Sequence, residues 1–123
     1  MAKKVLIVDD DIAISESLKV LLGVKGYDVD TASDGLAGLE KAKSLAPDLI
    51  VLDLFLPGMN GADVYAEIKK SGTPAASVPV IFLSSFSEKP DILNDPSISA
   101  DMFMPKPVDP LAMINRVAAI IGA

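Results

Sequence analysis

Three strongly apolar runs organise the chain, at residues 5–8, 49–52 and 78–83. Runs of this kind, without polar alternation, are typical of strands buried on both faces of a parallel sheet. Each run stops at polar residues, which are Asp9, Asp10 and Asp11 after the first, Asp53 after the second, and Ser84 and Ser85 after the third. We therefore predict three central strands with polar ends.

Between and after these runs, apolar positions recur with the spacing of amphipathic helices. The predicted inward residues are Ile14, Leu18, Leu21 and Leu22 in the first helix, Leu36, Leu39 and Ala42 in the second, Val64 and Ile68 in the third, and Leu111, Ile114, Val117, Ala118 and Ile121 in the last. Ser33 or Asp34 can cap the second helix, and Asp109 with Pro110 forms an N-cap and first-turn pair for the last. These signals predict a helix after each strand.

Two further strands complete the pattern. Residues 27–31 alternate between apolar and acidic side chains, which indicates a strand near a sheet edge, and residues 102–104 form a short fifth run. Five strands thus alternate with about five helical segments over residues 1–123, without a linker or a repeat. This order predicts one α/β domain with a parallel sheet, helices on both faces and right-handed crossovers.

Composition narrows the function classes. The 123 residues carry a formal net charge of −6 and show no basic face for a phosphate backbone, so we expect no nucleic-acid partner. The chain has no cysteine, which excludes thiolate metal sites, and no histidine, which removes the commonest general base. No apolar run is as long as a membrane span and no secretory signal is visible, so we expect a cytoplasmic protein without a membrane partner.

The polar ends of the strands form the candidate site. Asp9, Asp10, Asp53 and Ser84 should meet at one edge of the sheet, and Lys106 follows the fifth strand at the same edge. Carboxylates held this close repel one another and need a counter-charge, and a set of oxygen ligands suits a hard divalent cation such as Mg²⁺. Ordinary structural interpretations also exist, because Asp10 or Asp11 could simply cap the first helix and Lys106 could be a surface lysine.

At this point the sequence resembles a known family, the receiver domains of bacterial two-component response regulators. The resemblance covers the whole chain and rests on four segments in this order: IVDDD at residues 7–11, VLDLFLPGMNG at residues 51–61, PVIFLSS at residues 79–85, and KP at residues 106–107. Each segment alone is weak, but together they are a strong signal. The resemblance implies a doubly wound, flavodoxin-like five-stranded parallel sheet in the order 2-1-3-4-5.

The resemblance also implies a phosphoacceptor site. Asp53 would attack a phosphohistidine on a histidine kinase or phosphotransfer protein and form an acyl phosphate. Asp10, Asp53 and the Phe55 carbonyl would bind Mg²⁺ or Mn²⁺ directly, and Asp9 would bind it through a water. The resemblance thus implies a signalling module of a phosphorelay, which is phosphorylated and dephosphorylated itself and is no turnover enzyme.

Further roles come from the same resemblance. Ser84 would hydrogen-bond the phosphoryl group, Lys106 would pair with it, and the bond between Lys106 and Pro107 would be cis. Phe103 falls where the family usually has an aromatic switch residue. The remaining implied residues are the pocket-flanking rings Phe55 and Phe86, which we expect to slow hydrolysis of the acyl phosphate by excluding water.

The segment before the last strand departs from the family pattern. Pro90 suits the first turn of a helix, but Pro96 would fall inside a helix of normal length, where proline costs roughly 3 kcal/mol. We therefore expect a shortened fourth helix over residues 88–94. The last helix also carries Met113 and Ile120 at i and i+7 outside the predicted inward stripe, and these two residues are a candidate surface for a homodimer or a target protein.

Two other functions remain open from the sequence. Asp9, Asp10 and Asp11 resemble the opening motif of haloacid-dehalogenase-like phosphatases, although Pro107 and Val108 stand where those enzymes need further acids. A non-phosphorylated pseudo-receiver that only binds partners is the other alternative. Because these 123 residues contain no output domain, we expect a stand-alone receiver or one cut from a larger regulator.

Overall fold

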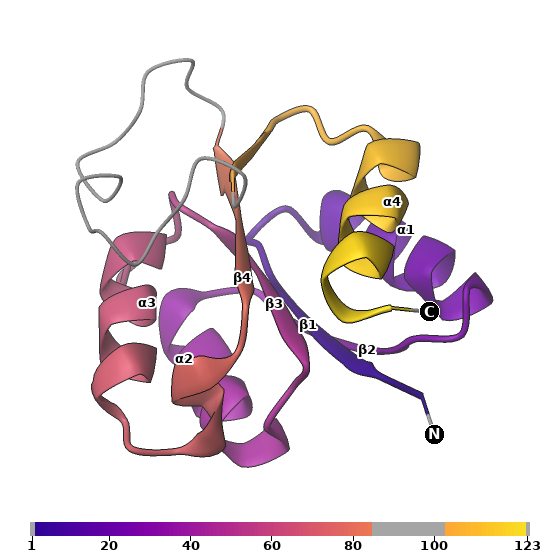
Figure 1. Cartoon of the computed structure of the whole chain (residues 1–123). Helices are drawn as coiled ribbons and strands as arrows, with labels where there is room; N and C mark the ends of the chain where they lie inside the picture. Colours follow the sequence, from indigo (N-terminus) through magenta and orange to yellow (C-terminus); the bar gives the residue numbers. More distant parts are fainter. Residues whose placement is uncertain (1, 85–102, 123) are drawn as a thin grey trace.

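The computed structural model describes residues 2–84 and 103–122, and in these the expected alternation of strands and helices is present (Figure 1). All strand pairs are parallel and the sheet order is β2-β1-β3-β4-β5, as predicted. The strands are β1 (Lys4–Val8), β2 (Asp28–Ala32), β3 (Leu49–Asp53), β4 (Val80–Ser84) and β5 (Phe103–Pro105). The helices are α1 (Ile12–Val24), α2 (Gly35–Leu45), α3 (Gly61–Lys70) and α4 (Pro110–Ile121), with a 3₁₀ turn at Pro74–Ser77.

The sheet separates two hydrophobic cores. Helices α2 and α3 cover one face and α1 and α4 the other (Figure 1). Successive residues of a strand point to opposite faces, so Ile50 and Leu52 enter the α2/α3 core whereas Leu49 and Val51 enter the α1/α4 core. Every residue of β3 and β4 is buried, which confirms the prediction of central strands from unbroken apolar runs. Each apolar side chain of these strands contributes about 1.5–3 kcal/mol when it leaves water.

Side-chain caps fix where the helices begin. Asp11 caps α1 by accepting hydrogen bonds from the N–H groups of Ala13 (3.0 Å) and Ile14 (3.3 Å). Asp34 caps α2, and Asp109 caps α4 with Pro110 in the first turn, as predicted. A cap of this kind is worth about 1 kcal/mol, so the turns after the strands are specified locally by the sequence.

The outward face of two helices was predicted wrongly. Leu36 and Leu111 were expected inside, but their side chains are 62% and 64% exposed. Met113 was expected on the surface with Ile120, but it is fully buried beside Val117 in the α1/α4 core. Helix α4 is apolar around most of its circumference, so spacing alone does not select the buried stripe. The predicted docking surface of Met113 and Ile120 is therefore wrong.

Two expectations fall outside the described residues, namely the shortened fourth helix over residues 88–94 and the position of Phe86. Within the described ranges, no helix combines the length and the apolar character that crossing a membrane requires.

Candidate functional site

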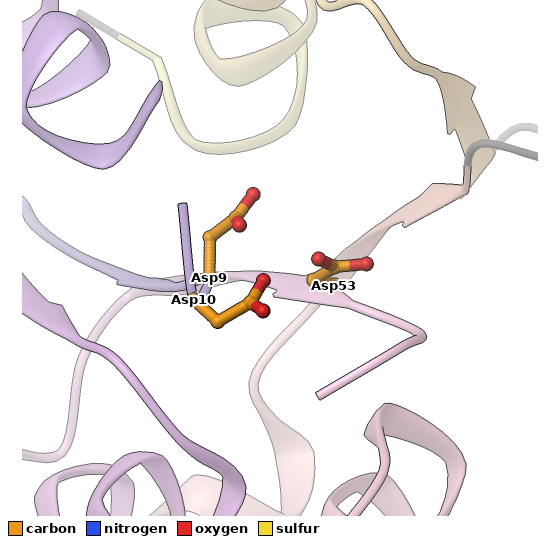
Figure 2. A group of neighbouring side chains, drawn as sticks. All are labelled: Asp9, Asp10 and Asp53. Atoms are coloured by element: carbon orange, nitrogen blue, oxygen red, sulfur yellow. The ribbon is translucent and has the colours of Figure 1, made fainter. Parts of the chain in front are cut away.

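Three carboxylates meet at the carboxyl edge of the sheet, beyond the ends of β1 and β3. Asp9 and Asp10 follow β1, and Asp53 is the last residue of β3 (Figure 2). One oxygen of each carboxylate lies within 4.8 Å of the others. Asp9 and Asp53 are buried, whereas Asp10 is exposed. The structure thus brings together the acids that the sequence pattern placed at this edge.

Backbone N–H groups orient the two buried acids. The N–H of Asp11 donates to Oδ1 of Asp9 at 2.9 Å, and the N–H of Phe55 donates to Oδ1 of Asp53 at 3.1 Å. Both donors lie two residues after the carboxylate that they contact, in the turns that follow the strands. The turn after each strand therefore holds one oxygen of its own acid and leaves Oδ2 for other partners.

Lys106 supplies that partner. Its ammonium donates a hydrogen bond to Oδ2 of Asp53 at 2.8 Å and forms an ion pair with Oδ2 of Asp9 at 3.0 Å. The N–H of Lys106 donates to the Ser84 carbonyl at 2.9 Å, which holds the start of the next segment against β4. The bond from Lys106 to Pro107 is cis, as the resemblance implied. Lys106 therefore bridges β1 and β3 from beyond the edge strand.

Burial and neighbouring charges shift the pKa values of Lys106 and Asp9. Burial works against the charged form of Lys106, but its hydrogen bond to Asp53 and the negative charges of Asp53 and Asp9 outweigh it, so the pKa of Lys106 is raised. Burial is the main influence on Asp9 and raises the pKa of its carboxyl, although the Asp11 N–H and Lys106 oppose this. Among residues 2–84 and 103–122, Lys106 is the one cation paired with this cluster, and it contacts two of the three carboxylates, so acidic groups outnumber basic ones.

The residues present fit a hard divalent cation. Their ligand atoms are all carboxylate oxygens, the chemistry that Mg²⁺ prefers. Oδ2 of Asp9 is fully buried and, despite the nearby ammonium, accepts no hydrogen bond of good geometry. It is the one such buried side-chain atom in the described ranges. A buried carboxylate oxygen left in this way is stabilised by additional positive charge.

The other predicted residues surround this cluster. Ser84 is buried at the end of β4, the strand that pairs with β3. Phe103 is partly buried on β5, where its ring stacks on Phe82 with centroids 5.1 Å apart. The Phe55 side chain is 50% exposed, while its backbone contacts Asp53.

Two glycines have packing roles that the sequence pattern did not predict. A Cβ on Gly61 would collide with the carbonyl oxygen of Asp53, and a Cβ on Gly35 would collide with the carbonyl oxygen of Met59. Both glycines follow a capping residue at the first position of a helix, Asn60 before α3 and Asp34 before α2. That pairing is visible in the sequence, but it does not reveal what the glycine packs against.

The sheet order and the strand-end acids define a doubly wound α/β domain with a ligand site at its carboxyl edge. The family model for the response regulator receiver domain matches residues 5–118. The chain therefore belongs to the receiver-domain family of two-component response regulators. Members of this family use Mg²⁺ at an acidic pocket and interact with histidine kinases and phosphotransfer proteins. This membership favours the receiver function over the haloacid-dehalogenase-like alternative.

Relatives and solved structures agree with the family. The chain is 34% identical to the DNA-binding response regulator MtrA of Mycobacterium tuberculosis over 119 residues, 97% of this chain and 50% of that protein. It is 37% identical to the transcriptional regulator RpaA of Synechocystis over 118 residues, 96% of this chain and 48% of that protein. The chain thus spans about half the length of the curated relatives that it matches.

Two solved structures extend the likeness to three dimensions. A CheY-like receiver domain of Methanospirillum hungatei is 27% identical with a TM-score of 0.80, over 97% of this chain and 93% of that one. A CheY from a CheX–CheY–BeF3–Mg complex of Borrelia burgdorferi is also 27% identical, with a TM-score of 0.82 over 96% of this chain and 88% of that one.

Proposed function

We propose that Asp53 is the phosphoacceptor of this receiver domain and that its donor is a phosphohistidine on a histidine kinase or phosphotransfer protein. The observation that carries the proposal is a buried carboxylate at the end of β3, held by the Phe55 N–H through one oxygen and by Lys106 through the other. Membership of the receiver family supports the donor class.

In the proposed reaction, an oxygen of the Asp53 carboxylate attacks the phosphorus in line with the departing histidine nitrogen. A P–O bond forms as the P–N bond breaks, and the histidine nitrogen leaves with the electron pair of that bond. An ionised carboxylate has no proton to lose, so no general base is required. Lys106 lies 2.8 Å from Asp53 and would neutralise charge on the transferred group.

In the proposed site, Asp10, Asp53 and the Phe55 carbonyl would hold Mg²⁺ or Mn²⁺, and Asp9 would contact it through a water. The bound ion would offset the negative charge shared by the carboxylates and the phosphoryl oxygens. The acid cluster supports this assignment, as does the related CheY whose structure includes BeF3 and Mg. Ser84 would hydrogen-bond the phosphoryl group, and Phe103 would respond to it as the switch residue.

The proposal treats residues 1–123 as one receiver unit that signals through its phosphorylation state and performs no turnover chemistry on a substrate. Family membership supports a cytoplasmic location beside the kinase. The relatives are DNA-binding regulators of about twice this length, which supports a receiver that belongs to a larger regulator as readily as a stand-alone one.

The test is phosphorylation by a small phosphodonor, followed by intact-mass spectrometry. We expect a phosphoryl adduct that needs Mg²⁺ and is lost in Asp53→Asn. Asp63→Asn, which changes an exposed acid on α3, is the matched control and should keep the adduct. An adduct that survives in Asp53→Asn contradicts the assignment. No adduct and no spectral change with beryllofluoride and Mg²⁺ would instead support the pseudo-receiver.

A further inference from the structure

The loop between β3 and α3, residues 54–60, contains the Phe55 N–H, which orients the Asp53 carboxylate. Its first residue, Leu54, donates its N–H to the Leu83 carbonyl at 3.0 Å, and the Gly61 N–H donates back to the Leu54 carbonyl at 3.0 Å. The loop is therefore closed at its base and attached to β4. Its base adjoins Asp53, and the Phe55 N–H within it contacts the Asp53 carboxylate.

The far end of this loop packs directly against the first residue of α2. A Cβ on Gly35 would collide with the carbonyl oxygen of Met59 and would lie 2.9 Å from its carbonyl carbon. A backbone carbonyl cannot rotate away as a flexible side chain does, so any larger residue at this position must move the loop or the helix. Gly35 is buried, and its lack of a side chain lets α2 and the loop touch.

The start of α2 and the base of the loop are each held by a hydrogen bond to an aspartate. On the helix side, Asp34 accepts a hydrogen bond from the Ala37 N–H at 2.8 Å and thereby fixes the first turn of α2. On the loop side, the Phe55 N–H donates to Oδ1 of Asp53 at 3.1 Å. A rigid helix start on one side and an oriented carboxylate on the other leave little freedom for the loop between them.

We propose that Gly35 is a positioning residue: its contact with Met59 sets the β3–α3 loop and, through the Phe55 backbone, the orientation of the Asp53 carboxylate and the affinity of the acid cluster for Mg²⁺. The part that concerns Mg²⁺ rests on the proposed function. The part that concerns the hydrogen bond between Phe55 and Asp53 does not. Gly35 thus acts on the site without being a ligand.

The test compares three glycine-to-alanine variants. In Gly35→Ala the added Cβ collides with the Met59 backbone in the loop. Gly38→Ala lies on the same helix, but the three nearest atoms to its added Cβ all belong to the Val8 side chain, the first at 2.7 Å, so its closest clash is with the core and not with the loop. Gly23→Ala in α1 meets nothing within 4 Å. The readouts are the Phe55 amide resonance in the Mg²⁺-free protein, the Kd for Mg²⁺, and the urea midpoint.

We expect Gly35→Ala to shift the Phe55 amide resonance and to weaken Mg²⁺ binding by about tenfold, the lower end of the losses caused by residues that orient metal ligands. Gly38→Ala should lower the urea midpoint and leave the other two readouts within twofold. Gly23→Ala should raise the urea midpoint slightly, because alanine favours a helix more than glycine does, and should leave the other two readouts unchanged. An unchanged Phe55 resonance and Kd in Gly35→Ala overturn the proposal, and so does an equal loss of affinity in Gly38→Ala.

A second pair of variants serves if Gly35→Ala does not fold. Asp34→Ala removes the N-cap of α2, which precedes the contact between Gly35 and Met59. Asp34→Asn loses the same charge but keeps a side chain that can cap the helix. Asp34→Ala should shift the Phe55 resonance and weaken Mg²⁺ binding, and Asp34→Asn should do neither. Equal behaviour of the two refutes the proposal. If the wild type binds no Mg²⁺, the proposed function fails, while the Phe55 resonance still decides whether Gly35 positions the loop.

Discussion

Replacing Lys106 with methionine removes the positive charge that the structure places among the acids. Lys106 is 16% exposed at its side chain and contacts Oδ2 of both Asp9 and Asp53. Methionine keeps much of the stem's apolar packing but offers no charge and no hydrogen bond. The variant therefore leaves two buried carboxylates facing each other without a counter-charge.

The expected loss follows from this burial. Removing one partner of a buried ion pair typically costs 3–5 kcal/mol because the other charge stays buried. Lys106 is partly exposed, and Asp9, whose pKa burial already raises, can take up a proton, so we expect a loss of about 3 kcal/mol. Mg²⁺ should reverse part of it, since binding at 100 times Kd stabilises a folded protein by about 2.7 kcal/mol.

The assay is urea unfolding followed by far-UV circular dichroism, in EDTA and in saturating Mg²⁺. Lys41→Met is the matched control, because Lys41 pairs with Asp30 at 3.1 Å on the surface with both side chains over 40% exposed. That pair is worth less than about 1 kcal/mol, and Mg²⁺ should not compensate for its loss. We expect Mg²⁺ to stabilise Lys106→Met more than the wild type. A Lys106→Met variant as stable in EDTA as Lys41→Met, or one without this extra gain, would refute the reasoning.

Three further predictions follow from single contacts. If the Phe55 ring screens the acyl phosphate from water, Phe55→Asn should speed its loss by up to tenfold, about 1.4 kcal/mol of barrier; equal or slower decay contradicts the screening. The raised pKa of Lys106 means that its stabilisation is present below pH 10.5 and lost as pH rises through the folded-state value, so wild-type stability in EDTA should fall more steeply there than that of Lys106→Met. Tyr27→Phe removes a 2.7 Å hydrogen bond from the hydroxyl to the Gly122 carbonyl and should cost about 1 kcal/mol without changing Mg²⁺ affinity.

The strand-end site was predictable because its logic is topological. A parallel sheet brings the carboxyl ends of its strands to one edge, so the acids after two buried runs and the lysine after the fifth strand were expected to meet there. The geometry agrees, with Asp9, Asp10 and Asp53 clustered and Lys106 bridging two of them. The order of strands along the chain therefore predicts well which residues share one edge of the sheet.

The buried stripe of α4 was not predictable for a related reason. A periodicity argument needs a polar face to contrast with the apolar one, and through the middle of α4 only Asn115 and Arg116 are polar. Two faces of α4 therefore fitted the helical spacing almost equally well. Packing against α1 buries the face that carries Met113 and Val117. Contacts between elements distant in sequence, such as that of Gly35 with Met59, lie beyond local patterns for the same reason.

The three consecutive aspartates at residues 9–11 have identical side chains but different roles, because their backbone positions differ. Asp9 directly follows β1 at the sheet edge, where it is buried and pairs with Lys106. Asp10 is exposed at the same cluster, where it can reach a cation from the solvent side. Asp11 turns away to cap α1, while its N–H orients Asp9. Because that cap fixes the turn that holds the Asp9 carboxylate, Asp11 helps to shape the site although its own carboxylate is not part of the acid cluster.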